Sequence, residues 1–128
     1  MAYVRQNVED LDGAERAGNG QCVALVQVEA QVPHTSTWTE GAAVRGNTTI
    51  VKGTAVATFV GGKYPNKAHG NHAAFYLGQN AAGIQVLDQW KSDKKPKISK
   101  RTMFFSGKNK DGSFIDPSNN GDALSIIE

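Results

Sequence analysis

The sequence has little cysteine and no long apolar run. Cys22 is the single cysteine among 128 residues, so an internal disulfide is excluded and a packed core has to supply the stability. No segment approaches the about eighteen apolar residues that span a bilayer, so we expect no membrane insertion. The first fifteen residues carry four acidic side chains and no continuous apolar segment, which argues against a secretory signal. We therefore expect synthesis in the cytoplasm and, for any work outside it, delivery by another route.

An excess of charge of one sign is missing as well. The chain has 14 basic and 12 acidic residues, a net charge of +2; this balance is too even to imply a nucleic-acid partner by itself, and we expect none. A hydrophobic content of 39% with 20% charged residues is typical of a globular protein, and without repeats or linkers we expect one domain over residues 1–128. The histidine pair in HGNH, residues 69–72, has no further cysteine or HExxH to complete a zinc site, so we expect no metal and no cofactor.

Hydrophobic periodicity predicts a helix followed by strands. Residues 21–32, QCVALVQVEAQV, place apolar side chains at helical spacing, with Asn19 as cap and Pro33 as stop, although the valines leave a strand as an alternative. A helical turn is expected near residues 40–44. Alternation and β-branched residues predict strands over 54–60, 72–77 and 84–90, and a further pair over 100–105 and 113–115. This order predicts the α+β class, with an N-terminal helix packed on an antiparallel sheet.

The cysteine stands at the predicted start of the helix. A helix N-terminus offers free N–H groups and partial positive charge, which stabilise a thiolate and can also bind the oxyanion of an acyl-transfer intermediate. Gly18 and Gly20 allow a sharp bend before Cys22 and leave space for a substrate. The alternative is that Cys22 is a small buried apolar residue, as free cysteines commonly are.

Three histidines, at positions 34, 69 and 72, are candidates for a catalytic base. His34 and His69 fall in segments predicted as loops, whereas His72 opens a strand that would hold it rigidly. If the hairpin pairs residues whose numbers sum to 162, Ala74 faces Asp88, and His72 and Asp88 are diagonal neighbours within reach of each other. Asp88 would then accept from one imidazole nitrogen while the other faces the thiol. The alternative to this catalytic role is that Asp88 occupies an exposed position at the edge of the sheet.

Two further features suggest binding surfaces. Trp38 and Tyr64, in predicted loops, are candidates to line a substrate groove, or else they cover a core. The run KSDKKPKISKR, residues 91–101, holds six basic residues and one acid; such runs are mostly solvated surface, but this one is also a candidate to attract an anionic polymer. A non-catalytic binding module for such a polymer is therefore an alternative to an enzyme.

Three short motifs, in order, carry a resemblance to a known group. GNGQCVALVQ, GNHAAFYLG and IQVLDQW resemble the papain-like cell-wall cysteine amidases of the CHAP and NlpC type. In those enzymes a glycine-rich bend often ends in Gln-Cys, a later strand carries Gly-x-His-x-Ala-x-Tyr-x-Gly, and a polar third residue follows on the next strand. The residues that match here are Gln21 and Cys22, then Gly70, His72, Ala74, Tyr76 and Gly78, and finally Asp88.

The small size narrows the resemblance to the type VI secretion amidase effectors. It implies a papain-like core in which Cys22, His72 and Asp88 are catalytic, and Gly20, Gln21 and Trp38 are our candidates for binding the oxyanion or substrate. It also implies hydrolysis of an amide in the peptide stem or cross-link of bacterial peptidoglycan, injection into the periplasm of a rival cell, and a cognate immunity protein that occludes the site. A Cys–His acyltransferase acting on another substrate remains an enzymatic alternative.

Overall fold

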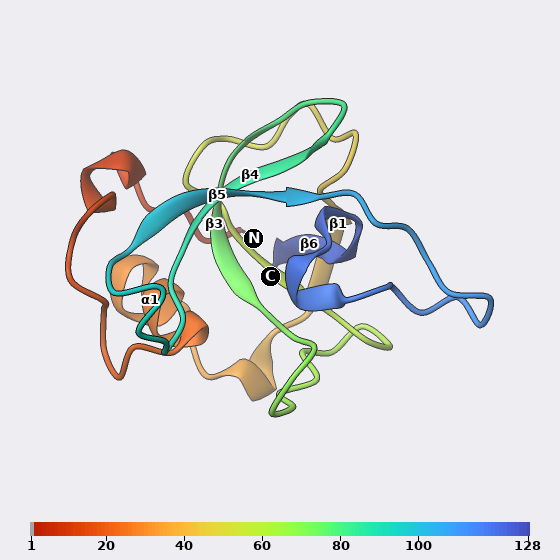
Figure 1. Ribbon diagram of the computed structural model, residues 1–128, viewed down its shortest axis with the longest axis horizontal. Coiled ribbons are helices and arrows are strands. Elements are labelled where there is room, and N and C mark those ends of the chain that lie inside the picture. The colour runs from red at the N-terminus through yellow and green to blue at the C-terminus, as the bar shows by residue number, and fades with distance from the viewer. Residues whose placement is uncertain (1) are drawn as a thin grey trace.

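The computed structural model describes residues 2–128 and contains one six-stranded sheet beside the helix α1, Cys22–Ala30. The strand order is β1-β6-β2-β3-β4-β5, and every neighbouring pair is antiparallel (Figure 1). The predicted α+β class is confirmed. The strands are β1 Glu40–Ala43, β2 Ala55–Thr58, β3 Ala73–Gln79, β4 Gly83–Asp88, β5 Ser99–Phe104 and β6 Leu124–Ile127.

Both faces of the sheet are buried, because successive side chains of a strand point to opposite sides. Leu25 and Val26 of α1 pack with one set of strand residues, and α1 contacts β3 most. Small side chains in β2 and β3 let the helix lie close to the sheet. The strand residues on the α1 side are Ala55, Ala57, Ala73, Phe75 and Leu87, and those on the opposite side are Val56, Ala74, Tyr76, Ile84, Val86 and Met103.

The predicted hairpin register is correct near the site and shifts farther away. Tyr76 pairs with Val86, as the sum of 162 requires. An irregularity beyond this pair moves the register by one residue, so that Gly78 faces Gln85 and not Ile84. Because the shift lies toward the turn, the pairs nearest Asp88 that these two strands form, Phe75 with Leu87 and Tyr76 with Val86, keep the predicted register.

Several predicted boundaries were wrong. The turn expected near residues 40–44 is strand β1, and residues 113–115 do not pair with 100–105 but close a local hairpin through a bridge between Lys108 and Phe114. The helix ends at Ala30, where Gln31 adopts a left-handed conformation before Pro33 is reached. Strand β6 was missed because LSII, residues 124–127, is short and gives little periodicity.

None of the helices in residues 2–128 is long and apolar enough to cross a membrane. Within the same residues, no group of three or more His, Cys, Asp or Glu side chains is placed to hold a metal ion.

Candidate active site

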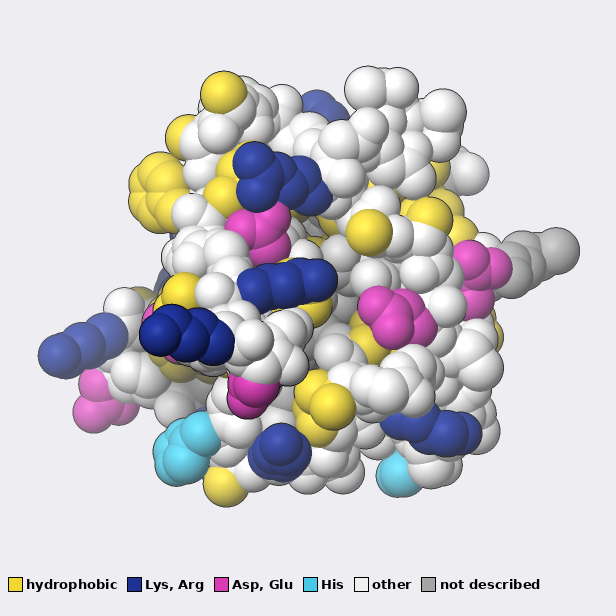
Figure 2. Space-filling view, turned by 90° about the vertical axis from the view of Figure 1, so that its right-hand side faces the viewer, with side chains coloured by type: hydrophobic (Ala, Val, Ile, Leu, Met, Phe, Trp, Pro, Cys, Tyr) yellow, Lys and Arg dark blue, Asp and Glu magenta, His cyan; other side chains and the backbone are white. Residues whose placement is uncertain are grey.

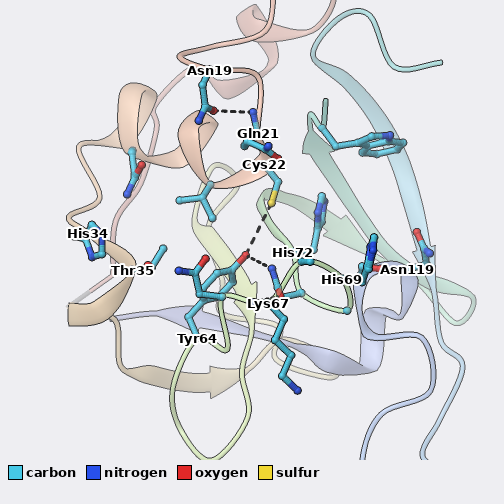
Figure 3. A pocket seen from close by; sticks show the side chains of 18 of the residues that line it. Asn19, Gln21, Cys22, His34, Thr35, Tyr64, Lys67, His69, His72 and Asn119 are labelled. Carbon is cyan, nitrogen blue, oxygen red and sulfur yellow. Dashed lines mark hydrogen bonds between the residues drawn. The ribbon is translucent and has the colours of Figure 1, made fainter. Parts of the chain in front are cut away.

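The bend before the helix places Cys22 at the first position of α1, on the wall of a pocket. Gly18 and Gly20 adopt φ values of +55° and +87°, which L-residues rarely tolerate, and a Cβ on Gly18 would lie 2.9 Å from that of Ala24. The N-cap position is Gln21 and not Asn19, and Gln21 makes no side-chain cap hydrogen bond; the Asn19 side chain accepts the Gln21 N–H at 2.9 Å (Figure 3). The free N–H groups of the first turn therefore lie next to the sulfur.

Gln21 lines the pocket, but Gly20 does not. Gly20 is buried, and its α-carbon faces the guanidinium of Arg16, which in turn donates to the backbone carbonyl of Trp90 at 2.9 Å. The interpretation of Gly20 as a substrate contact is thus corrected: its role is to shape the bend, because only a glycine turns there without strain.

A buried amide that the sequence analysis missed ties this bend to the sheet. Gln89 is 0% exposed, and its carbonyl accepts the Ala17 N–H at 2.7 Å. Its amide donates to the carbonyls of Ala17 at 2.9 Å and Gln21 at 2.7 Å. The only signal in the sequence was an uncharged polar residue directly after Asp88. Through Gln89, the end of β4 fixes the residue that precedes Cys22.

His72 is held from both its backbone and its ring. Its N–H donates to the Thr58 hydroxyl at 3.0 Å, and its carbonyl accepts the Thr58 N–H at 3.0 Å. His72 is 4% exposed, and its Nε2 lies 2.8 Å from Oδ2 of Asp88. Because Asp88 occupies Nε2, the ring nitrogen left for the interaction with Cys22 is Nδ1. The structure therefore brings the three predicted residues Cys22, His72 and Asp88 together.

Asp88 is 0% exposed and is shared by three cationic partners, so it is not an exposed edge residue. Its Oδ2 accepts from His72 and, at 2.7 Å, from Nε of Arg101. Its Oδ1 lies 2.9 Å from Nζ of Lys95, an ion pair without the direction of a hydrogen bond. Burial alone would raise the pKa of Asp88, but His72 and Arg101 outweigh it and lower this pKa to about 2. Asp88 is thus ionised at any pH at which the fold operates.

The thiol and the imidazole shift each other toward an ion pair. Burial acts to raise the pKa of Cys22, but hydrogen bonding and charge interaction with His72 lower it below its ordinary value. Burial likewise acts to lower the pKa of His72, whereas Asp88 and Cys22 raise it. A lowered thiol pKa beside a raised imidazole pKa favours the thiolate–imidazolium pair, which is the reactive form of a cysteine nucleophile.

Tyr64 lines the pocket, and Trp38 lies behind it. The Tyr64 hydroxyl is 3.9 Å from the Cys22 sulfur (Figure 3). Trp38 is 1% exposed, donates its Nε1–H to the Pro33 carbonyl at 2.9 Å and packs against the Tyr64 ring with centroids 4.9 Å apart. Trp38 as a substrate-binding residue is therefore corrected to a core residue, because its faces are covered and its polar hydrogen is used.

The pocket has a volume of about 780 Å³, which is within the usual range for ligand sites. All three histidines of the chain line it, together with two cationic side chains and several amides, and no Asp or Glu is among the lining residues that the structure describes. Trp90 forms part of the wall, with its ring edge-on to His72 and near both Lys95 and Arg101. The principal lining residues are Gln21, Cys22, Tyr64, Lys67, His69, His72, Trp90 and Arg101.

The basic run at residues 91–101 is largely paired within the fold. Lys95 and Arg101 bind Asp88, Lys97 pairs with Glu15, and Lys100 lies 2.7 Å from Glu9. On the face shown in Figure 2, basic side chains are interspersed with acidic and uncharged ones. Four of the six cations thus have acidic partners, which weakens the hypothesis that this run grips an anionic polymer.

A thiol at a helix N-terminus beside an imidazole and a buried carboxylate, on an α+β scaffold, is an arrangement typical of enzymes with a thiol nucleophile. The family model for "domesticated amidase effector 2" matches residues 2–127, and the chain belongs to this family. It is 49% identical to the "Type VI secretion amidase effector 2 protein" of Salmonella typhi, over 133 residues that include all of both chains. A solved structure of "Type 6 secretion amidase effector 2 (Tae2)", also 49% identical, superposes with a TM-score of 0.93 and covers 98% of this chain and 94% of its own. The predicted resemblance to type VI secretion amidase effectors is confirmed.

Proposed function

We propose that this protein is a cysteine amidase that hydrolyses an amide bond in the peptide stem or cross-link of bacterial peptidoglycan. The observation that carries the proposal is that Cys22 and His72 line one open pocket, while the buried Asp88 is hydrogen-bonded to His72 at 2.8 Å. Membership of an amidase effector family supports amide hydrolysis, and the shifted pKa values of the thiol and imidazole support a cysteine nucleophile.

The reaction begins with attack of the Cys22 thiolate on the amide carbonyl carbon, which forms a C–S bond and places the negative charge on the former carbonyl oxygen. The Cys22 N–H at the start of α1 is a donor for this oxyanion. His72, protonated at Nδ1, gives its proton to the leaving nitrogen as the C–N bond breaks. His72 then takes a proton from water, the hydroxide attacks the thioester, and C–S cleavage releases the acid and restores the thiolate. Asp88 holds the imidazole in position throughout.

The same family membership supports a role as an antibacterial toxin. The relatives are named type VI secretion effectors, so we propose that the chain is made in the cytoplasm and delivered to the periplasm of a target cell. A cell that makes such an enzyme needs protection from it. An immunity protein that covers the pocket around Cys22 is the partner we expect, because the pocket is open and contains the nucleophile.

Digestion of purified peptidoglycan tests the proposed function. The wild-type protein is incubated with sacculi, and the soluble fragments are analysed by mass spectrometry for new amine and carboxyl ends, which identify the bond that is cut. Cys22→Ala and His72→Ala are expected to release none. Intact sacculi with the wild-type protein, or full release by Cys22→Ala, would contradict the proposal.

The same samples separate the two alternatives. A binding module would sediment with sacculi and release nothing, in the wild type and Cys22→Ala alike. An acyltransferase would produce fragments whose new carbonyl end carries an added amine in place of a hydroxyl. The pairing of four cations in residues 91–101 is one reason not to expect the result for a binding module.

A further inference from the structure

Tyr64 lies next to Cys22 and is held there by contacts at both its ring and its hydroxyl. Its ring is 8% exposed and packs on the buried Trp38, while its hydroxyl points into the pocket toward the Cys22 sulfur at 3.9 Å (Figure 3). The side chain thus has a buried base and a polar tip at the reacting atom.

The hydrogen-bond network determines which way the Tyr64 hydrogen points. The Lys67 backbone N–H, which can only donate, lies 2.7 Å from Oδ1 of Asn71, so this atom is the amide oxygen. The Asn71 NH₂ group therefore donates to the Tyr64 oxygen at 3.0 Å. A hydroxyl that accepts from Asn71 has its own hydrogen free to donate elsewhere, and the polar atom on its pocket side is the Cys22 sulfur.

The Tyr64 hydroxyl also keeps its proton while the site works. Burial raises the pKa of Tyr64 above its ordinary value, and the adjacent Cys22 thiolate raises it further, since a second anion there is unfavourable. Tyr64 is therefore a hydrogen-bond donor at every pH at which Cys22 is the nucleophile.

A separation of 3.9 Å is long for a hydrogen bond to the resting sulfur, but it leaves room for a closer partner. During attack, the carbonyl oxygen of the substrate lies one bond from the carbon that the sulfur binds. Effective oxyanion donors stand about 2.7–3.1 Å from that oxygen. Catalytic hydrogen bonds are commonly long without substrate and shorten in the transition state.

We propose that the Tyr64 hydroxyl is an oxyanion donor, and so a catalytic residue, oriented for this role by Asn71. It acts with the N–H groups at the start of α1 and transfers no proton itself. The inference deepens the proposed cysteine acyl-transfer function and depends on it for the natural substrate. It applies equally to any acyl group that Cys22 attacks, which allows a test that does not need peptidoglycan.

The test compares two reactions of the same thiol in Tyr64→Phe. Acylation by p-nitrophenyl acetate passes through a tetrahedral oxyanion, and its rate is measured from the p-nitrophenol that this step releases. Alkylation by iodoacetamide forms no oxyanion. We expect the acylation rate of Tyr64→Phe to fall about 10²-fold, the size of effect seen on removing one oxyanion donor, while alkylation changes by less than about threefold. Tyr76→Phe is the matched control, because the Tyr76 hydroxyl bonds Gln79 in the opposite core.

The pH dependence distinguishes an oxyanion donor from a residue that only tunes the thiol. If Tyr64 merely lowers the pKa of Cys22, Tyr64→Phe will lose both reactions equally and regain them at high pH. If it binds the oxyanion, the loss of acylation will persist at every pH. Equal loss in both reactions, or acylation within threefold of the wild type, would overturn the proposal.

Asn71→Asp provides a second variant that keeps the tyrosine. A carboxylate at position 71 still accepts the Lys67 N–H, but it also accepts the Tyr64 hydrogen and so withdraws it from the oxyanion. We expect acylation to fall by a larger factor than alkylation; an unchanged ratio would contradict the orienting role. Peptidoglycan digestion by the same proteins keeps the two proposals apart. Wild-type acylation without peptidoglycan cleavage refutes the proposed substrate, whereas full cleavage by Tyr64→Phe refutes the role of Tyr64.

Discussion

Replacing Asp88 by asparagine removes a buried negative charge and keeps the shape of the side chain. An asparagine oxygen at the position of Oδ2 can still accept from His72 and Arg101, but its NH₂ group then faces Nζ of Lys95, where Oδ1 now lies at 2.9 Å. The cationic side chains around Asp88 lose their counterion, and breaking a buried ion pair from one side costs about 3–5 kcal/mol. We expect Asp88→Asn to lower the free energy of unfolding by about that amount at pH 6.

Part of the difference in unfolding free energy between the wild type and Asp88→Asn depends on pH in a predictable direction. The pKa of Asp88 is lowered from 3.8 to about 2 on folding, which corresponds to about 2 kcal/mol of stability. For a carboxyl with a lowered pKa, this contribution is fully present above pH 3.8 and is lost as the pH falls through about 2. At pH 3, roughly half of it remains. The gap between wild type and Asp88→Asn should therefore narrow by about 1 kcal/mol between pH 6 and pH 3.

Urea unfolding followed by fluorescence, with a reductant present, measures this gap at each pH. The lowered pKa values of the exposed Glu9 and Glu15 affect both proteins, so they cancel in the difference. A difference that is the same at pH 6 and pH 3, or one that widens at low pH, would show that Asp88 does not hold its charge against the buried cations. Asp88 could then not act as the negative partner of His72.

Cys22 and three residues that shape or surround its pocket give four further predictions. Cys22 should be alkylated by iodoacetamide below the ordinary thiol pKa of about 8.5, and His72→Ala should move the midpoint of the rate upward. Gln89→Leu, which leaves buried groups of the bend unpaired, should cost about 3 kcal/mol in urea unfolding and lower the turnover number, whereas an unaltered turnover number would dismiss its positioning role. Trp38→Ala should cost about 3–5 kcal/mol of unfolding free energy, and a stability equal to that of the wild type would contradict its place in the core. Gly20→Ala should lower the melting temperature through backbone strain of about 1–2 kcal/mol, and no change would rule that strain out.

The residues of the site could be predicted from the sequence more completely than the fold could. Cys22, His72 and Asp88 were predicted from local signals: a thiol after a glycine bend, a histidine opening a strand, and a carboxylate inside an apolar strand. These signals are local because the helix or strand that carries each side chain also sets its position. The register near Asp88 was also predictable, since alternation with Val86 and Leu87 fixes which face Asp88 occupies.

What could not be predicted depended on contacts between distant segments. Trp38 resembled a groove residue because a loop aromatic carries no sign of its burial; the covering side chain, Tyr64, comes from elsewhere in the chain. The pairing of Lys95 and Arg101 with Asp88 was hidden because a basic run looks the same whether it faces solvent or an internal carboxylate. Strand β6, inserted between β1 and β2, is a long-range pairing that LSII alone does not indicate.

The end of β4 explains why the site forms as a unit. Three consecutive residues leave the strand in different directions: Asp88 binds the His72 ring, Gln89 holds the bend before Cys22, and the Trp90 ring packs edge-on against His72. A displacement of this strand end would therefore move the His72 ring and the bend that carries Cys22 together and not separate them. Since β4 lies between β3 and β5, both of which pair with it along its length, the position of the strand end is determined by the sheet and not by a loop. The geometry of the Cys22 thiol and the His72 imidazole is thus a consequence of sheet register, which is why two side chains fifty residues apart in the chain meet without a local connection.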